Sequence, residues 1–399
     1  MATNNNNKAL NVPHLRFSEF SGEWNKCTIN DLATVVGGGT PDTTVKSYWG
    51  GDIQWFTPSE IGKNKYVDFS LRTITRDGLD NSSAKLLPLH TILLSSRATV
   101  GECSIASNEC TTNQGFQSLI AKQCNIDFLY YLIQTKKKDL IRNACGSTFL
   151  EISANEIRKI KVAVPVQNEQ EQIAKLLSLI DERIATQNKI IEKLQSLIKG
   201  LVDELMTVLL KGKLYPFSSF YIKAGEGGTP TTSVVEYYTE GTIPFIKIED
   251  LSCKYLTNNK DFITELGMQK SSAWLIPSKS VIYSNGATIG AISINEYPVC
   301  TKQGILGIVP NTNINVEYLY LLMSSSYFSK EISRIITEGT MKTAYLKDIN
   351  HIKCPLPSMA QQKNITNLTS SIEEKLSIEQ ELLRFLNLQK QYLLHMMFI

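Results

Sequence analysis

The chain has 399 residues, of which 42% are hydrophobic and 20% are charged, and its formal net charge is +3. At about 150 residues per domain this length predicts two or three domains, and the composition excludes a disordered or collagen-like protein. No segment approaches the roughly 18 consecutive apolar residues of a membrane span, and the Asn-rich start lacks the apolar core of an export signal. We therefore expect a globular cytoplasmic protein, and so small a net charge does not by itself indicate nucleic-acid binding.

The metal-ligating and thiol-bearing residues form no recognisable motif. Eight cysteines are scattered without a CxxC pair or a Cys/His spacing, and the four histidines show no helical pairing. We expect reduced, mostly buried thiols and structural or surface histidines. The sequence therefore predicts neither a metal site nor a disulfide framework.

The chain contains the same motifs twice, in the same order. GGTP at residues 38–41 returns at 227–230, 189 residues later. LLPLHTILLSSRATVGECSI (86–105) matches LIPSKSVIYSNGATIGAISI (275–294), and TTNQGF (111–116) matches CTKQGI (300–305). Six blocks recur at an offset that drifts only from 189 to 192 residues. The chain is therefore an internal duplication.

Each copy begins with strand-like sequence. Short β-branched or aromatic runs alternate with Gly, Pro and Asn turns, which is typical of a mixed α+β domain. After an N-terminal tail over 1–19, we predict these two domains at 20–165 and 213–357.

Each copy ends in a segment with coiled-coil periodicity. From Ile173 to Val208 the apolar residues recur at spacings of four and three, interrupted only by Gln187, and the second segment repeats the pattern more loosely. We predict helices over 166–212 and 358–399 that pair antiparallel. At about 1.5 Å per residue each would span roughly 60 Å, more than the ~34–36 Å of one turn of B-DNA.

These motifs resemble one known family. The start PHLRFSEFSGEWNKCTINDLATVVGGGTP, the block ILLSSRATVGECSI, the element TNQGF and the helix EQEQIAKLLSLIDERI are similar to the specificity subunits of type I restriction-modification enzymes. The resemblance runs from about Val12 to the C-terminus, in the family's order of recognition domain, conserved helix, recognition domain, conserved helix.

The resemblance implies a fold and a function. The fold is α+β, with two repeated strand-rich target recognition domains separated by two long antiparallel coiled-coil helices in a pseudo-two-fold arrangement. Each recognition domain would read one half of a bipartite DNA target. The helices would set the spacer and dock two modification subunits, which bind S-adenosylmethionine and methylate adenine. Restriction subunits would complete the nuclease, and this chain would hold no cofactor itself.

The sequence offers no catalytic machinery of its own. It has no NPPY- or DPPY-type tetrapeptide for a flipped adenine and no GxGxG-type loop for S-adenosylmethionine. We therefore predict a non-catalytic specificity subunit. Two alternatives stay open at this point: a non-enzymatic interaction scaffold with paired domains on a coiled-coil rod, and a self-sufficient DNA enzyme.

The first set of candidate DNA contacts lies where the two copies diverge most, as two domains that read different half-sites would require. Phosphates are bound by Lys, Arg, hydroxyl and amide groups, and base edges are read by Arg, Lys, Asn and Gln. The set is Lys63, Lys65, Tyr66, Arg72 and Arg76 in the first domain, and Lys247, Lys254, Tyr255 and Lys260 in the second.

The second set of candidate DNA contacts consists of residues that directly follow predicted strands and lie next to glycines. It comprises Ser96, Arg97, Asn113 and Gln114, with Ser284, Asn285, Lys302 and Gln303 in the second copy. Because Gln114 and Gln303 are shared by both copies, they cannot easily explain different half-sites, and we expect them to position phosphate or support the fold.

The long helices carry more apolar surface than one seam requires. Outside the heptad positions of the first helix stand three leucines, Leu176, Leu197 and Leu209. We predict that these leucines bind the modification subunits.

Overall fold

The computed structural model describes residues 11–146, 150–286, 288–336 and 342–399. The chain forms two compact units, Met1–Asn188 with Glu381–Ile399 and Lys189–Gln380. Each unit contains one strand-rich domain and one end of each of two long helices, α6 (Gln167–Leu209) and α11 (Met359–Met397). Both long helices are therefore shared between the units.

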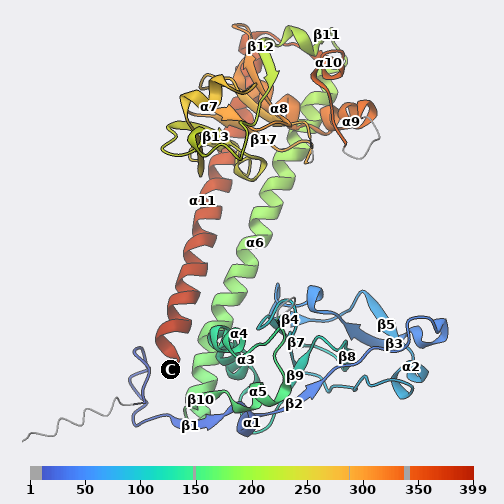
Figure 1. Ribbon diagram of the computed structural model, residues 1–399, viewed down its shortest axis with the longest axis vertical. Helices are drawn as coiled ribbons and strands as arrows, with labels where there is room; N and C mark the ends of the chain where they lie inside the picture. The colour runs from blue at the N-terminus through green and yellow to red at the C-terminus, as the bar shows by residue number, and fades with distance from the viewer. Residues whose placement is uncertain (1–10, 147–149, 287, 337–341) are drawn as a thin grey trace, which may run out of the picture. The chain divides into compact units, whose positions relative to one another are not determined.

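The first domain is a mixed α+β fold (Figure 1). Its strands are β1 (Asn25–Thr28), β2 (Ala33–Gly37), β3 (Trp49–Phe56), β4 (Tyr66–Val67), β5 (Arg72–Ile74), β6 (Ile92–Leu94), β7 (Cys103–Ala106), β8 (Cys110–Thr112), β9 (Gln117–Ala121) and β10 (Lys161–Val164). Its helices are α1 (Ile29–Leu32), α2 (Arg76–Asp80), α3 (Ile126–Thr135), α4 (Lys137–Arg142) and α5 (Ala154–Lys159), with 3-10 turns at Lys46–Tyr48 and Pro58–Glu60. The strands form a five-stranded sheet of order β2-β9-β6-β7-β4, a three-stranded sheet β5-β3-β8 and the pair β1-β10.

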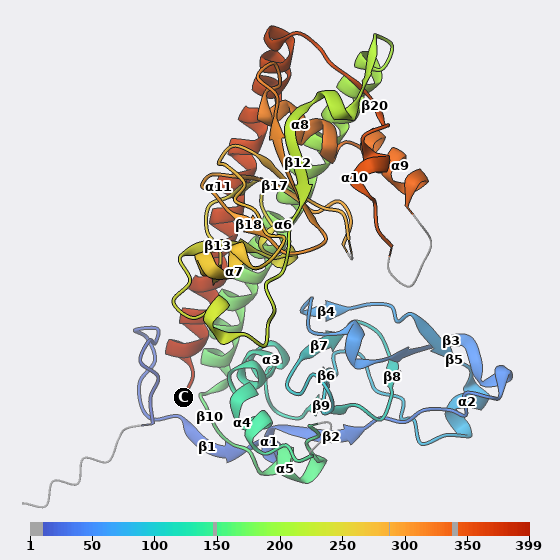
Figure 2. The same cartoon turned by 45° about the horizontal axis from the view of Figure 1, so that its top comes forward.

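The second domain repeats this plan (Figure 2). Its strands are β11 (Leu214–Pro216), β12 (Tyr221–Glu226), β13 (Ile243–Ile246), β14 (Tyr255–Leu256), β15 (Asp261–Ile263), β16 (Val281–Ser284), β17 (Ile292–Asn295), β18 (Cys300–Thr301), β19 (Ile305–Pro310) and β20 (Lys353–Pro355). Its helices are α7 (Glu265–Gln269), α8 (Val316–Ser324), α9 (Ser326–Ile335) and α10 (Leu346–Ile349), with 3-10 turns at Phe217–Ser219, Val235–Tyr237 and Ile248–Asp250. The sheets are β12-β19-β16-β17-β14, β15-β13-β18 and β11-β20.

The two domains share strand order and strand direction. β6 pairs antiparallel with β7 and β9, as β16 does with β17 and β19. The short edge strands β4 and β14 pair parallel with β7 and β17. The prediction of a duplicated α+β domain is therefore confirmed.

Equivalent helices begin with the same side chains. Asn125 Oδ1 accepts a hydrogen bond from the backbone N–H of Phe128 at the start of α3, and Asn315 Oδ1 accepts one from Tyr318 at the start of α8. An Asn at this position satisfies one of the amide groups that the first helical turn leaves without a partner. The two copies therefore use one capping signal to place equivalent helices.

The repeated GGTP motif is explained by close backbone packing. A Cβ atom on Gly38 would lie 2.0 Å from the carbonyl oxygen of Asn113, and one on Gly227 would lie 2.1 Å from that of Thr301. The motif therefore requires glycine because its backbone lies against the strand end that leads into the TNQGF or TKQGI element.

The long helices complete the core of both units. In unit 1, Ile173 and Leu177 of α6 lie in one buried cluster with Leu393 and Met397 of α11. In unit 2, Val202 and Met206 of α6 share a cluster with Ile365 of α11. Because the start of α6 meets the end of α11 in one unit and the reverse holds in the other, the predicted antiparallel pairing is confirmed (Figure 1). In the described part of the chain no helix is long and apolar enough to cross a membrane.

The glycine packing gives a first prediction. Gly38→Ala should lower the free energy of unfolding by about 1–3 kcal/mol, because the new methyl group overlaps backbone atoms that cannot move aside. Gly200→Ala is the matched control: Gly200 lies in α6 with nothing within 4 Å of its added Cβ. That change should raise stability by about 0.5–1 kcal/mol, because alanine favours helix. Urea unfolding of both variants measures the difference, and equal stabilities would contradict this packing.

Candidate nucleic-acid interface

Arg72 is an exposed cation held in a defined place. It begins β5, and its guanidinium carbon lies 3.6 Å from the ring centroid of Trp49 and 5.4 Å from that of Trp55. Stacking on an aromatic ring restricts a guanidinium group without using its N–H donors. Arg72 therefore has the chemistry of a pre-positioned hydrogen-bond donor.

The equivalent position of the second domain carries the opposite charge. Arg72 pairs with Trp55 across β5 and β3, and Asp261 pairs with Phe245 in the same register of β15 and β13. Asp261 forms an ion pair of 2.9 Å with Lys247, and this hydrogen bond raises the pKa of the lysine. The two domains therefore present different chemistry at one structural position.

The remaining exposed candidates lie on loops and short elements. Arg76, on α2, is 3.4 Å from Asp80 one helical turn later. A surface pair of this kind contributes little stability and leaves the arginine free to exchange partners. The other exposed cations and amides of the predicted sets are Lys63, Gln114, Lys260, Lys302 and Gln303, and the two tyrosines, Tyr66 and Tyr255, are exposed as well.

The QG element is tied to the GGTP turn in both copies. Gln114 Oε1 accepts a hydrogen bond from the hydroxyl of Thr40, and the backbone N–H of Gln303 donates to Thr229 Oγ1 over 3.4 Å. The Asn113 side chain is turned back on its own loop, where its oxygen accepts from the N–H of Gly115 at 2.8 Å. These contacts connect the two loops in both domains, through the side chain of Gln114 in the first and through the backbone of Gln303 in the second.

Three predicted contacts are buried. Ser96 and Ser284 have no exposed surface, and Asn285 retains 1%. The amide of Asn285 donates to the carbonyl oxygen of Ala344 at 3.1 Å. Since a buried side chain has no surface for DNA to touch, the expectation of DNA contact is corrected for these three residues: they lie inside the domain.

Arg97 has a carboxylate partner. One terminal nitrogen of its guanidinium lies 2.7 Å from both carboxylate oxygens of Glu151, and both side chains are about two-fifths exposed. Gly286 stands at the equivalent place in the second copy, so this ion pair belongs to the first domain alone.

Lys65 and Tyr66 point at helices of their own unit. Lys65 Nζ lies 2.7 Å from Asp127 Oδ1, at the start of α3, and donates to Ser178 Oγ of α6 at 2.7 Å. The Tyr66 hydroxyl donates to the same Asp127 at 2.8 Å. Only 10% of the Lys65 side chain is exposed. The pair therefore joins strand β4 to both helices.

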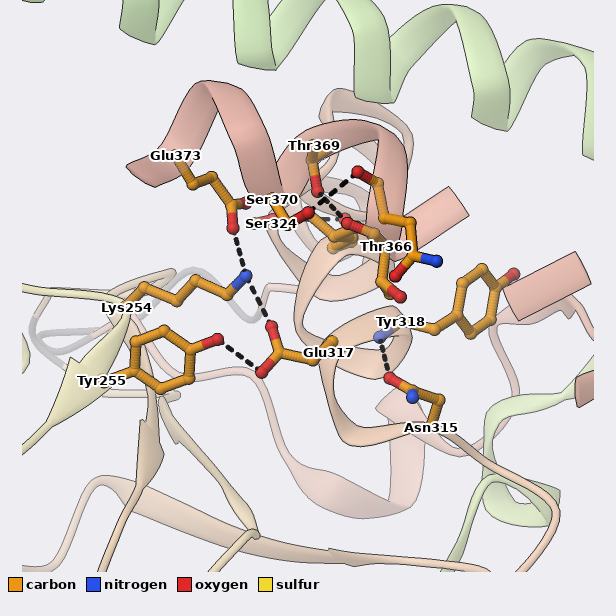
Figure 3. A network of polar contacts seen from close by, with 12 residues as sticks. Lys254, Tyr255, Asn315, Glu317, Tyr318, Ser324, Thr366, Thr369, Ser370 and Glu373 are labelled. Atoms are coloured by element: carbon orange, nitrogen blue, oxygen red, sulfur yellow. Dashed lines mark hydrogen bonds and ion pairs between the residues drawn. The ribbon is translucent and has the colours of Figure 1, made fainter. Parts of the chain in front are cut away.

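Lys254 and Tyr255 make the equivalent contacts in unit 2 (Figure 3). Lys254 Nζ lies 2.5 Å from Glu317 of α8 and 2.5 Å from Glu373 of α11, and the lysine side chain is 14% exposed. The Tyr255 hydroxyl donates to Glu317 at 2.6 Å. Burial, followed by this hydrogen bond, raises the pKa of Tyr255 well above its usual range. We call each Lys-Tyr pair with its acidic partners a clamp.

Each clamp borders a cavity. The cavity in unit 1 measures about 800 Å³ and is lined in part by Lys65, Cys103 and Lys390. The cavity in unit 2 measures about 810 Å³ and is lined in part by Lys254 and Cys253. Their equal size and equivalent lining show that the duplication extends to the contact between domain and helix.

Sequence reasoning missed the acidic partners of the clamps and a second contact that both copies make. Gln170 Oε1 accepts from the backbone N–H of Asn125, and Gln362 Oε1 accepts from that of Asn315, so each long helix holds the start of α3 or α8. The repeat itself carried a signal for these residues. Gln362 follows Gln170 by 192 residues, and Glu373 follows the acidic residue Asp181 of α6 by the same offset.

The three leucines predicted to bind partners differ in exposure. Leu176 packs against the core of unit 1 and Leu209 against that of unit 2. Leu197 is 55% exposed on α6. Sequence periodicity did not single out the further exposed apolar residues of the helices, among them Leu179, Phe385, Leu388 and Tyr392, and it placed Val208 in the seam, although Val208 is 61% exposed.

Comparison with known proteins places the chain in one family. The model described as Type I restriction modification DNA specificity domain matches residues 21–196 and 220–387. The MjaIX specificity subunit, from a type I restriction enzyme of Methanocaldococcus jannaschii, is 29% identical over 382 residues, covering 89% of this chain and 88% of its own.

Solved structures share the fold. The type I restriction-modification S subunit from M. genitalium is 18% identical, with a TM-score of 0.54 over 97% of this chain and 99% of its own. A chain from a study of complex assembly and conformational transition of the type I R-M system is 13% identical, with a TM-score of 0.57 over 93% and 96%.

The chain belongs to the type I restriction-modification DNA specificity family. It is a DNA sequence-recognition subunit, and the prediction of a non-catalytic specificity subunit is confirmed by this membership and by the names of the relatives. The alternatives of an interaction scaffold and of a self-sufficient enzyme are thereby disfavoured. Among the described residues, no group of three or more His, Cys, Asp or Glu side chains is placed to hold a metal ion.

The two cavities differ in thiol chemistry, which gives a second prediction. Burial raises the pKa of Cys103 to about 12, whereas Cys253 is exposed. At about pH 8, iodoacetamide should therefore modify Cys253 and the exposed Cys145 in the folded protein and spare Cys103, because the thiolate is the reactive species. Peptide mass measurement gives the order of modification. Modification of Cys103 as fast as Cys253 would contradict the burial.

Proposed function

We propose that this chain reads a bipartite DNA target in the cytoplasm, one half with each recognition domain. The observation that carries the proposal is one fold present twice with different chemistry at an equivalent position, exposed Arg72 in one copy and the partly exposed Asp261 in the other. Identical folds bind in the same manner, and different side chains at the same place select different bases. A duplicated reader therefore fits a target with two unlike halves.

The long helices fit the role of a spacer. Helix α6 has 43 residues and α11 has 39, so each is roughly 60 Å long at about 1.5 Å per residue. Each contributes apolar side chains to the core of both units. Two helices of this length that run from one recognition domain to the other support a target whose halves are separated by unread bases.

The same duplication supports the proposed assembly. A chain that repeats its surface presents two equivalent docking places, which favours two modification subunits in the complex. Those subunits would bind S-adenosylmethionine and methylate adenine, and restriction subunits would join them to form the nuclease. This chain would contribute recognition and no cofactor.

Within each domain we assign DNA contact to cations and amides that are exposed or partly exposed. Arg72 is the strongest candidate for base reading, since a guanidinium group donates two parallel hydrogen bonds to guanine. Lys63 is a candidate for phosphate binding. The other members of the group are Arg76, Arg97, Asn113 and Gln114 in the first domain, with Lys247, Lys260, Lys302 and Gln303 in the second.

A third prediction separates base reading from phosphate binding. In the complex with modification subunits, Arg72→Ala should cost about 1–3 kcal/mol and relax one base position of one half-site. Lys63→Ala should weaken binding to all sequences alike and reduce the salt slope by about one unit. Selection from a randomised bipartite DNA pool measures both variants.

The outcome that contradicts this assignment is specific. If Arg72→Ala changes both half-sites or neither, Arg72 does not read bases. If the unaltered complex selects no bipartite sequence, the proposed target is wrong.

A fourth prediction concerns docking. Leu197→Glu should weaken assembly with modification subunits by about tenfold or more, because it places a charge in an apolar contact while the side chain lies outside the core. Ser196→Glu is the matched control, since it adds the same charge to an exposed neighbour about 100° around the helix. Native mass spectrometry of the mixed subunits measures assembly. Equal assembly of the two variants would remove Leu197 from the docking surface.

A further inference from the structure

We propose that the two clamps are positioning devices, which hold each recognition domain in one orientation on its helices and so make the complex selective for the number of unread base pairs between the half-sites. This inference rests on the proposed bipartite target. It assigns Lys65 and Lys254, whose positions suggested DNA contact, a role in the geometry of recognition.

Each clamp joins three elements that are distant in sequence. In unit 2 Lys254, directly before β14, reaches Glu317 of α8 and Glu373 of α11, 63 and 119 residues later along the chain (Figure 3). The tyrosine next to the lysine fixes the same Glu317 through its hydroxyl. Since the three elements meet at one nitrogen, rotation of the domain on the helix would separate charges.

The charged groups of the second clamp are largely withdrawn from water, which distinguishes them from surface ion pairs. The side chains of Lys254, Glu317 and Glu373 are 14%, 24% and 19% exposed. Removing one partner of such a cluster leaves the other charges poorly solvated and without compensation. The arrangement with all three charges together is therefore strongly preferred over a rotated domain.

In each domain the clamp lies in the divergent segment, just before the position at which the two domains carry opposite charges. Arg72 follows Lys65 by seven residues, and Asp261 follows Lys254 by seven residues. The strand that carries each of these side chains, β5 or β15, starts from a point anchored to the long helix. The position of the reading strand relative to the helix thus follows from the clamp.

A recognition domain held in one orientation matches one spacer length, which is the number of unread base pairs between the half-sites. Each added base pair turns a half-site by about 35° around the DNA axis and moves it by about 3.4 Å. A domain held at one angle cannot follow such a shift, whereas a loosened domain can. The ratio of affinities for DNA probes of different spacer length therefore reports how rigidly the clamp holds its domain. This ratio does not depend on which bases are read.

The two clamps differ in the contact that the lysine makes with the long helix. Lys65 reaches α6 through the neutral hydroxyl of Ser178, while Asp181 of α6 pairs with Lys390 of α11 at 2.7 Å. In unit 2 Ile198 of α6 stands at the place that Lys390 of α11 has in unit 1, and Glu373 pairs with Lys254 directly. The second clamp carries the ionic contact to the helix itself, so we expect the larger effect there.

The test uses the full chain in complex with modification subunits and DNA probes whose spacer is the preferred length or one base pair shorter or longer. Lys254→Met keeps the length of the side chain and removes its charge. Discrimination between spacers should be about tenfold or more in the unaltered complex and fall to about threefold or less in Lys254→Met, because sub-ångström placement governs such ratios. The bases selected in each half-site should not change.

Companion variants separate this role from simple destabilisation. Lys254→Arg keeps the charge and the ion pairs, and it should restore most of the discrimination. Tyr255→Phe removes one hydroxyl and should give an intermediate value. Lys65→Met should have a smaller effect than Lys254→Met. Lys260→Met, an exposed lysine of the same segment, should weaken binding to all three probes alike and leave their ratio unchanged.

Opposite results overturn the inference. If Lys254→Met folds and keeps the spacer preference, the clamp does not set spacing. If Lys254→Met does not fold, Tyr255→Phe and Glu373→Gln decide the matter, and unchanged spacer ratios in both reject the proposal. Failure of the bipartite target itself would be seen separately, as an unaltered complex that selects no paired half-sites.

Discussion

The structure depends on the packing of each strand-rich domain against one end of two antiparallel helices. Helix α3 lies between its sheet and α6, with Phe128, Leu129 and Leu132 fully buried in the same cluster as Ile173 and Leu177. Removal of this apolar surface from water supplies the main driving force for the contact. Without the helix ends the domains would expose that face. Because the same interface between domain and helices occurs in both units, the two units have equivalent cores and equivalent cavities.

Some cations of each domain form ion pairs within the fold, and others are exposed. Cations at the inner side of each domain are paired with carboxylates of α3, α8 and the long helices, as Lys65 and Lys254 show. Cations at the outer side, such as Arg72 and Lys260, are exposed. The modest net charge of the chain is consistent with this division, because some cations are neutralised by nearby carboxylates while others remain exposed.

The two copies preserve side chains that support the fold and vary others to which we assign DNA contact. Both keep the Asn cap, the glycines packed against backbone, the glutamine that holds the helix start, and the Lys-Tyr clamp. They differ at Arg72 and Asp261, and at Asn113 and Lys302. A duplicated protein that binds two unlike half-sites needs this pattern, since the scaffold must place two surfaces alike and the surfaces must select differently.

The sequence by itself determined the duplication, the α+β domains, the two long helices and the family, because periodicity and repeated motifs are local properties that a linear chain records. Tertiary structure alone decided the roles of individual side chains. Lys65 is a lysine in a divergent segment until Asp127, 62 residues later, is brought beside it. Ser96 and Asn285 look like loop residues until the domain buries them. Leu176 and Leu197 look equivalent until only one is covered by the core. Burial and partner identity arise from residues distant in sequence, so no local pattern contains them.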